Sequence, residues 1–300
     1  MQRIPVAFGS PKEQQRFIEQ NACFLREYPR LWKLGEQVFL RSLKKPDRRE
    51  VERLPKDDPA VIAFDDKTRA DIIIFYLGRM AFDDLGEILT LAGNGSGFGA
   101  YKILRGMYER IVTALYIEKN PAEARIFAES SPIFELNYLK RVFEGSPETK
   151  GRFSEEAMRT VERDAAAAQA KRKQSTCPKC RQPITQDAWT RVSLYAMAKE
   201  AEPALNVFYA QFYLEGTAQS HANMFGIERR LIWKGSGFTY KETSQEEARF
   251  AAHLGHHLMV GLLRMQNTHF ALGLDDEVRK RADAFAAVWN SSPASPPQSE

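Results

Sequence analysis

The sequence predicts an all-α fold, and three observations support this prediction. Apolar residues recur at helical spacing along most of the 300 residues. Alternating apolar and polar runs rich in β-branched residues, and the short turns that join such strands, are scarce. Capping boxes, in which a serine precedes a glutamate by three residues, stand at Ser10 and Ser244. We therefore expect a multi-helix, bundle-like single domain with one small insertion.

The first third of the chain reads as helices separated by two breaks. Residues 10–42 begin at the Ser10 capping box, with proline at the first helical position, and accommodate one or two helices. Residues 43–60 contain three prolines and many charges, which indicates a surface connection. Helical spacing resumes from Asp66 to Leu91 and again over 100–118.

The glycine-rich segment 94–99 lies between the last two of these helices. It lacks the Lys-Ser/Thr pair and the preceding buried strand of a phosphate-binding P-loop. A tight turn between two antiparallel helices is therefore favoured over an anion site.

The remaining two thirds continue in the same pattern. Helical spacing predicts further helices over 121–144, 153–174, 186–201, 203–225, 244–270 and 275–289. The turn-rich stretch around 235–237 predicts a short irregular or β-like ribbon. Residues 291–300 are rich in serine and proline and are expected to be disordered. The predicted organisation is an N-terminal helical segment and linker over 1–64, a helical domain over 65–290 and the tail over 291–300.

Composition limits the partners and the location. The 43 basic and 39 acidic residues give a net charge of +4, which permits RNA as a partner without identifying it. No stretch approaches the roughly 18 consecutive apolar residues of a membrane helix. The N-terminus lacks the apolar core of a secretory signal, so we expect a cytoplasmic protein without a membrane partner.

Cys177 and Cys180 form the most specific local motif. Their spacing lets two thiolates share one tetrahedral zinc ion, which predicts a knuckle-like insertion at about 175–183. Two ligands are missing, and a distant histidine or a second CxxC pair in a symmetric homodimer could supply them. A redox pair and an exposed turn without metal are the alternatives.

Two pairs of polar residues lie one helical turn apart. Arg105 and Glu109 flank the apolar stripe of the 100–118 helix close to Tyr101, so they form either a surface ion pair or an anion-binding group. Thr217 and His221 lie among aromatic residues, where a histidine is either a core residue or a general base.

A third cluster of polar residues lies on the 244–270 helix. His253 and His257 have the spacing of a two-histidine metal site, but Leu254 replaces the glutamate of the metalloprotease motif. Packing and solvent contact are the favoured interpretation.

Several of these residues also carry a resemblance to a family. The runs 94–97 and 101–113, together with Trp189, residues 197–201 and Tyr213 to His221, resemble the bacterial proteins grouped as DUF5677, a domain of unknown function. The resemblance covers about 65–270. It implies a helical domain with a recurrent Arg-x3-Glu motif, here Arg105 and Glu109. It also implies a hydroxyl-x3-His motif, here Thr217 and His221, although the family more often has serine at the hydroxyl position. No activity follows from it.

Two hypotheses for function remain open, and one of them is not enzymatic. In the first, the protein is a binding or regulatory module with a polar pocket of Arg105, Glu109 and His221, with Tyr101 and Thr217 beside it. In the second, it is a HEPN-like, metal-independent ribonuclease of the defence or toxin type. His221 would then transfer protons and Arg105 would stabilise the phosphorane. The Arg-x4-His spacing of such ribonucleases occurs at Arg264 and His269, but a match of this kind is expected by chance.

Overall fold

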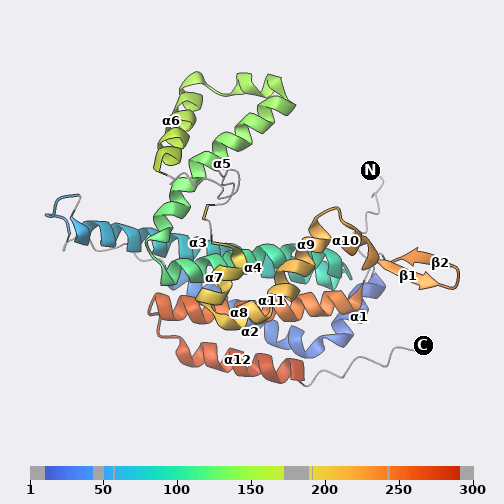
Figure 1. The fold of residues 1–300 in the computed structure, drawn as a ribbon. Helices are drawn as coiled ribbons and strands as arrows, with labels where there is room; N and C mark the ends of the chain where they lie inside the picture. The colour runs from blue at the N-terminus through green and yellow to red at the C-terminus, as the bar shows by residue number, and fades with distance from the viewer. Residues whose placement is uncertain are drawn as a thin grey trace, which may run out of the picture. The chain divides into compact units, whose positions relative to one another are not determined.

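A computed structural model describes residues 11–42, 51–56, 58–171, 189–190, 192–241 and 244–290. Over these residues the predicted all-α fold is confirmed, with one two-stranded ribbon added (Figure 1). The elements in chain order are α1 (Pro11–Gln20), α2 (Ala22–Ser42), α3 (Pro59–Gly93), α4 (Gly97–Lys119), α5 (Glu123–Gly145), η1 (Pro147–Arg152), α6 (Glu155–Lys171), α7 (Leu194–Ala201), α8 (Pro203–Val207), η2 (Ala210–Leu214), α9 (Glu215–Ser220), α10 (Met224–Glu228), β1 (Leu231–Lys234), β2 (Gly237–Tyr240), α11 (Gln245–His269) and α12 (Asp275–Asn290). Within these ranges, none of the helices combines the length and apolar character needed to cross a bilayer.

The described residues divide into two compact units, whereas the sequence led us to expect one domain over 65–290. The first unit comprises those within Met1–Asp47, Asp71–Lys119 and Leu194–Glu300, and the second those within Arg48–Ala70 and Asn120–Ser193. Helical spacing shows which face of a helix is apolar but not which neighbour covers it. The pattern over 121–174 therefore gave no sign that these helices pack mainly on each other.

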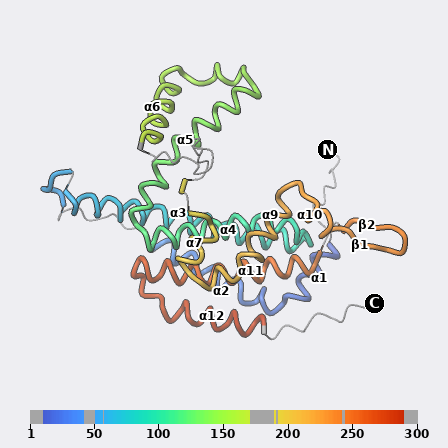
Figure 2. The backbone as a smooth tube through the Cα atoms, viewed as in Figure 1, coloured from blue at the N-terminus to red at the C-terminus, as the bar shows by residue number. Residues whose placement is uncertain are grey.

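Helix α4 forms the centre of the first unit. It packs against α11, α9, α7 and η2, and α11 packs in turn against α12 and α2 (Figures 1 and 2). The sequence predicts one buried stripe with flanking residues along α4, but Ala114 and Ile117, which lie outside both, are also buried. A helix covered on most sides belongs to a core, and its apolar residues need not keep to one face.

The glycine-rich turn between α3 and α4 is a helix–helix turn, as predicted. Gly95 has a φ of +75°, a conformation that side chains other than glycine rarely adopt. Its carbonyl oxygen accepts a hydrogen bond of 3.0 Å from the backbone N–H of Ser244. The Ser244 hydroxyl in turn accepts from the N–H of Glu247 at 3.3 Å, which confirms the predicted N-cap of α11. The turn is thus fastened to the start of α11.

Helices α3 and α4 are also joined by a buried ion pair. Arg110 of α4 donates to the carboxylate of Asp84 on α3, whose side chain is 9% exposed. Burial raises the pKa of Asp84 to about 6, and Arg110 opposes part of that rise.

The segment 203–225, predicted as one helix, is broken into four short elements. The turn at Ala210–Leu214 is a π-helix, and α9 ends at Ser220. Asn223 then caps α10, because its side-chain oxygen accepts from the N–H of Gly226 at 2.8 Å. After α10, the antiparallel strands β1 and β2 confirm the predicted ribbon around Gly235.

In the second unit, α5 packs against α6 and η1. Arg125 at the start of α5 forms a two-pronged contact with Asp66 of α3, with nitrogen–oxygen distances of 2.7 and 3.1 Å. Phe127 of the same helix packs edge-on against Trp189, with ring centroids 5.1 Å apart.

We expect the start of α4 to tolerate no side chain at Gly97. A Cβ there would meet the backbone nitrogen of Ala248 and lie 2.6 Å from the carbonyl carbon of Glu247, and backbone atoms have little freedom to move aside. Gly97→Ala should lower the free energy of unfolding by about 1–3 kcal/mol in chemical denaturation.

Gly261, an exposed glycine within α11, provides the matched control. A Cβ at Gly261 would meet no atom within 4 Å, so Gly261→Ala should raise stability by about 0.5–1 kcal/mol through helix propensity. Equal effects of the two substitutions would contradict the close packing of α4 on α11.

Candidate functional site

Helices α4 and α9 approach each other at Gly216. A Cβ on Gly216 would lie 2.6 Å from both the Cβ of Arg105 and the carbonyl oxygen of Tyr101, so only glycine permits this distance between the two backbones. Phe212, one turn earlier, stacks on Tyr108 of α4 with ring centroids 5.2 Å apart. These contacts show that α9 runs along α4 in the opposite direction, because lower numbers on one helix meet higher numbers on the other.

Arg105 and Glu109 form the ion pair predicted from their spacing. Their nitrogen–oxygen distance is 2.9 Å, and the two side chains are 25% and 40% exposed. The guanidinium of Arg105 also lies over the ring of Tyr213, 5.1 Å from its centroid. Its Nε is buried and has no hydrogen-bond partner within the described part of the chain. The Arg105 guanidinium is therefore packed against the ring of Tyr213 in η2, whereas Glu109 is more exposed.

Thr217 and His221 lie at the end of α9, and only Thr217 lies within the helix. The Thr217 hydroxyl donates to the carbonyl oxygen of Tyr213 at 2.6 Å, a bond within the helical segment itself. His221 lies beyond the last residue of α9 in extended conformation, and it is exposed. No contact found among the described residues joins it to Arg105 or Glu109, so the shared pocket of these three residues remains a prediction.

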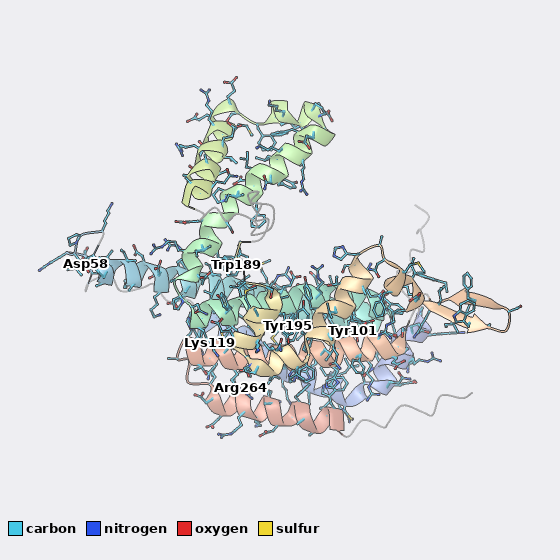
Figure 3. All side chains as sticks on the ribbon, viewed as in Figure 1. Asp58, Tyr101, Lys119, Trp189, Tyr195 and Arg264 are labelled. Atoms are coloured by element: carbon cyan, nitrogen blue, oxygen red, sulfur yellow. The ribbon has the colours of Figure 1, made fainter. Side chains whose placement is uncertain are left out.

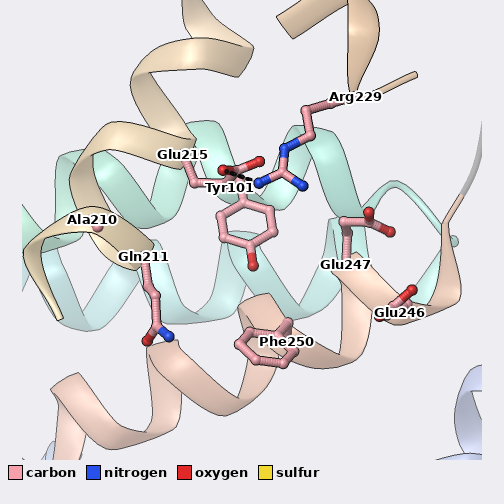
Figure 4. A pocket seen from close by; sticks show the side chains of 8 residues that line it. All are labelled: Tyr101, Ala210, Gln211, Glu215, Arg229, Glu246, Glu247 and Phe250. Carbon is pink, nitrogen blue, oxygen red and sulfur yellow. Dashed lines mark hydrogen bonds and ion pairs between the residues drawn. The ribbon is translucent and has the colours of Figure 1, made fainter. Parts of the chain in front are cut away.

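A pocket of about 330 Å³ lies beside the crossing of α4 and α9 (Figure 4). Its walls come from α4, the π-helical turn, α9, the first turns of α11 and the residue that follows α10. The lining residues are Tyr101, Ala210, Gln211, Glu215, Arg229, Glu246, Glu247 and Phe250. Tyr101 lies near the start of α4, with Lys119 at its other end (Figure 3).

Tyr101 forms the floor of this pocket. The residue is only 6% exposed, and its hydroxyl points into the space bordered by Gln211 and Phe250 (Figure 4). The hydroxyl has no hydrogen-bond partner among the residues that the structure describes. Burial is the main cause that raises the pKa of Tyr101, and the carboxylates of Glu215 and Glu247 add to it. Tyr101 is thus a neutral hydrogen-bonding group that is open only toward the pocket.

Two ion pairs border the pocket. Arg229 donates to Glu215 at 3.2 Å, and Lys241 donates to Glu247 at 3.2 Å. The sequence pattern indicates Tyr101 as a site residue but none of these four, because they are separated by up to 32 positions and share no motif. Glu247 was interpreted only as part of a helix cap.

Comparison with known proteins identifies the family. Residues 71–238, more than half of the chain, match the family described as a family of unknown function, DUF5677. The chain belongs to the DUF5677 family. Comparisons with curated proteins and with solved structures found no match. The resemblance noted in the sequence is thereby confirmed.

The region matched by DUF5677 includes most of the pocket. Tyr101, Gln211, Glu215 and Arg229 lie within it, whereas Glu246 and the remainder of α11 follow it. The Arg-x3-Glu motif lies one turn along α4 from Tyr101, on the other side of the Gly216 contact.

The histidines of α11 are packed among aromatic rings. His253 stacks on Trp289 with centroids 4.5 Å apart, and His256 packs edge-on against Phe285 at the same distance. The indole N–H of Trp289 donates to Nδ1 of His256 at 3.3 Å. Burial lowers the pKa of His253 to about 4 and that of His256 to about 3. Across the described residues, no group of three or more potential ligands is placed to hold a metal ion.

The remaining sequence motifs are unrelated to this pocket. His269 forms a hydrogen bond of 2.8 Å with Asp71 of α3, while Arg264 is exposed. Cys177 and Cys180 lie outside the described residues, so the zinc knuckle remains a prediction.

The buried histidines should make the folded protein sensitive to acid. An unfolded histidine has a pKa of about 6.5, so between pH 6.5 and 3 the unfolded chain binds a proton at position 256 that the folded chain does not. Stability should therefore fall as pH drops through this interval, by at most about 1.4 kcal/mol per pH unit from His256.

His256→Phe keeps an aromatic ring and removes the titrating group, so its unfolding free energy should vary less with pH than that of the wild type. Urea denaturation at several pH values measures this difference. If the unfolding free energies of the two proteins vary equally with pH, His256 binds a proton in the folded protein as readily as in the unfolded chain, which would contradict the prediction.

Proposed function

We propose that this chain is a binding module whose ligand is a small molecule held in the Tyr101 pocket. The observation that carries the proposal is the Tyr101 hydroxyl, which belongs to a residue only 6% exposed and points into the pocket (Figure 4). A hydroxyl that faces a pocket can both donate a hydrogen bond to a bound molecule and accept one from it.

The π-helical turn at Ala210–Leu214 supports the same proposal. Such turns are rare and are frequently found at functional sites. This one supplies Ala210 and Gln211 to the pocket wall. The helix thus departs from regular geometry at the point where it borders the pocket.

A bound molecule would contact segments far apart in the sequence. Tyr101 comes from α4, Gln211 from η2 and Phe250 from α11. A ligand that touches all three stabilises the arrangement in which they meet, by an amount set by its concentration relative to its Kd. This coupling gives the module a regulatory capacity.

The ribonuclease hypothesis receives less support from the geometry. Metal-free cleavage of RNA needs a proton-transfer group and a phosphate-stabilising cation near the same atom. His221 lies past the C-terminal end of α9, and α9 runs away from Glu109 along α4. Arg105 is engaged with Glu109 and Tyr213.

Incubation with labelled tRNA in EDTA distinguishes the two hypotheses. We expect no cleavage by the wild type above that of His221→Ala. Cleavage that survives chelation and is lost in His221→Ala would replace the binding proposal with the ribonuclease.

The binding proposal is tested by a thermal-shift screen with a library of small metabolites. Some compounds should raise the Tm of the wild type, and Ala210→Trp should abolish these shifts because its indole would fill the pocket. Ala204→Trp is the matched control, since Ala204 is an exposed residue of α8 that does not line the pocket. Shifts that persist in Ala210→Trp, or a library without any hit, would contradict the proposal.

A further inference from the structure

More negative than positive side chains line the pocket. Three carboxylates line it, from Glu215, Glu246 and Glu247, against the single guanidinium of Arg229. Arg229 pairs with Glu215, and Lys241 pairs with Glu247. Glu246 has no ion-pair partner within the described ranges. One negative charge is therefore left uncompensated at the pocket.

The N-terminus of α11 opens toward the pocket but is already occupied by acidic residues. A helix N-terminus attracts anions through its free N–H groups and its dipole. Here Glu246 and Glu247 lie in the first turn, and the Ser244 hydroxyl accepts one of the free N–H groups. An incoming anion would meet these carboxylates, so the helix end disfavours an anionic ligand.

Three of the four charged side chains that act on Tyr101 are carboxylates. The carboxylates of Glu215, Glu247 and Glu246 all act to raise the pKa of its hydroxyl, and only Arg229 acts against them. The pocket thus has more carboxylates than cations in its lining, which favours a positively charged ligand.

The pocket also offers an apolar and a neutral polar surface. The ring of Phe250 borders it and is 43% exposed, so it can cover the apolar part of a ligand or contact a cation through its face. The oxygen of the Tyr101 hydroxyl and the amide oxygen of Gln211 can each accept a hydrogen bond. These groups match a ligand that donates hydrogen bonds at one end and is apolar at the other.

We propose that the pocket binds a small organic cation, a primary ammonium group attached to an apolar body. The ammonium group donates to the carboxylate of Glu246 and to the hydroxyl of Tyr101, while the apolar body packs on Phe250. This inference rests on the proposed function, because it names the class of ligand for the same pocket.

Three probes of matched size and different charge test the inference: benzylamine, benzyl alcohol and benzoate. The calorimetric titration is done near pH 7, where free benzylamine is protonated and free benzoate is ionised. Benzylamine should bind roughly tenfold more tightly than benzyl alcohol, and benzoate should bind most weakly.

Glu246→Gln should weaken benzylamine about fivefold and leave benzyl alcohol unchanged, because the substitution removes a charge and keeps the shape. Glu228→Gln is the matched control, since Glu228 is an exposed carboxylate of α10 that does not line the pocket. Thermal unfolding of both variants verifies that they are folded. Tyr101→Phe should also weaken benzylamine, by roughly threefold for one neutral hydrogen bond.

Some results would overturn the proposal of a cationic ligand and leave the binding module in place. These are equal affinities for benzylamine and benzyl alcohol, or tightest binding of benzoate, provided that Ala210→Trp abolishes the binding. Equal effects of Glu246→Gln and Glu228→Gln on benzylamine would also overturn the inference. If none of the three probes binds, the inference is wrong, and the library screen decides separately whether the pocket binds another molecule.

Discussion

The first compact unit depends on the close packing of α4 against its neighbours, which two glycines make possible. Gly97 brings the start of α4 against the backbone of α11 at Ala248, and Gly216 brings α9 against α4 at Tyr101. Both contacts involve backbone atoms, which have little freedom to move. The distances between these helices are therefore fixed by the backbone rather than by flexible side chains. Side chains from α4, η2, α9, α11 and the residue after α10 consequently converge at one pocket.

The polar groups near the crossing of α4 and α9 fall into two sets on either side of Gly216. On one side, Arg105 is held by Glu109 and by the ring of Tyr213, and its exposed surface is small. On the other side, the hydroxyl of Tyr101 is directed into open space (Figure 4). An ion pair that packs against a ring holds its side chains in fixed positions. A hydroxyl without a hydrogen-bond partner at the floor of a pocket is available to bind a ligand. The pair of Arg105 and Glu109 is thus suited to supporting the pocket that lies next to it.

The titratable groups of α11 illustrate how surroundings decide the role of a residue. Near its start, the carboxylates of Glu246 and Glu247 border the pocket, and Glu247 pairs with Lys241. One to three turns later, His253 and His256 are enclosed by aromatic rings, and burial holds them neutral. The same helix therefore presents charge to the pocket and an uncharged face to the core.

The sequence by itself determined the helical class, the turn at Gly95, the cap at Ser244 and the pairing of Arg105 with Glu109. These features depend on residues within about one helical turn of each other, so spacing and local chemistry are sufficient to predict them. Only the tertiary structure decided that α9 ends before His221, that His253 faces Trp289, and that Glu215 and Glu246 meet beside Tyr101. Such contacts join residues far apart in the chain, and they depend on how closely helices approach, which the periodicity of a single helix does not encode.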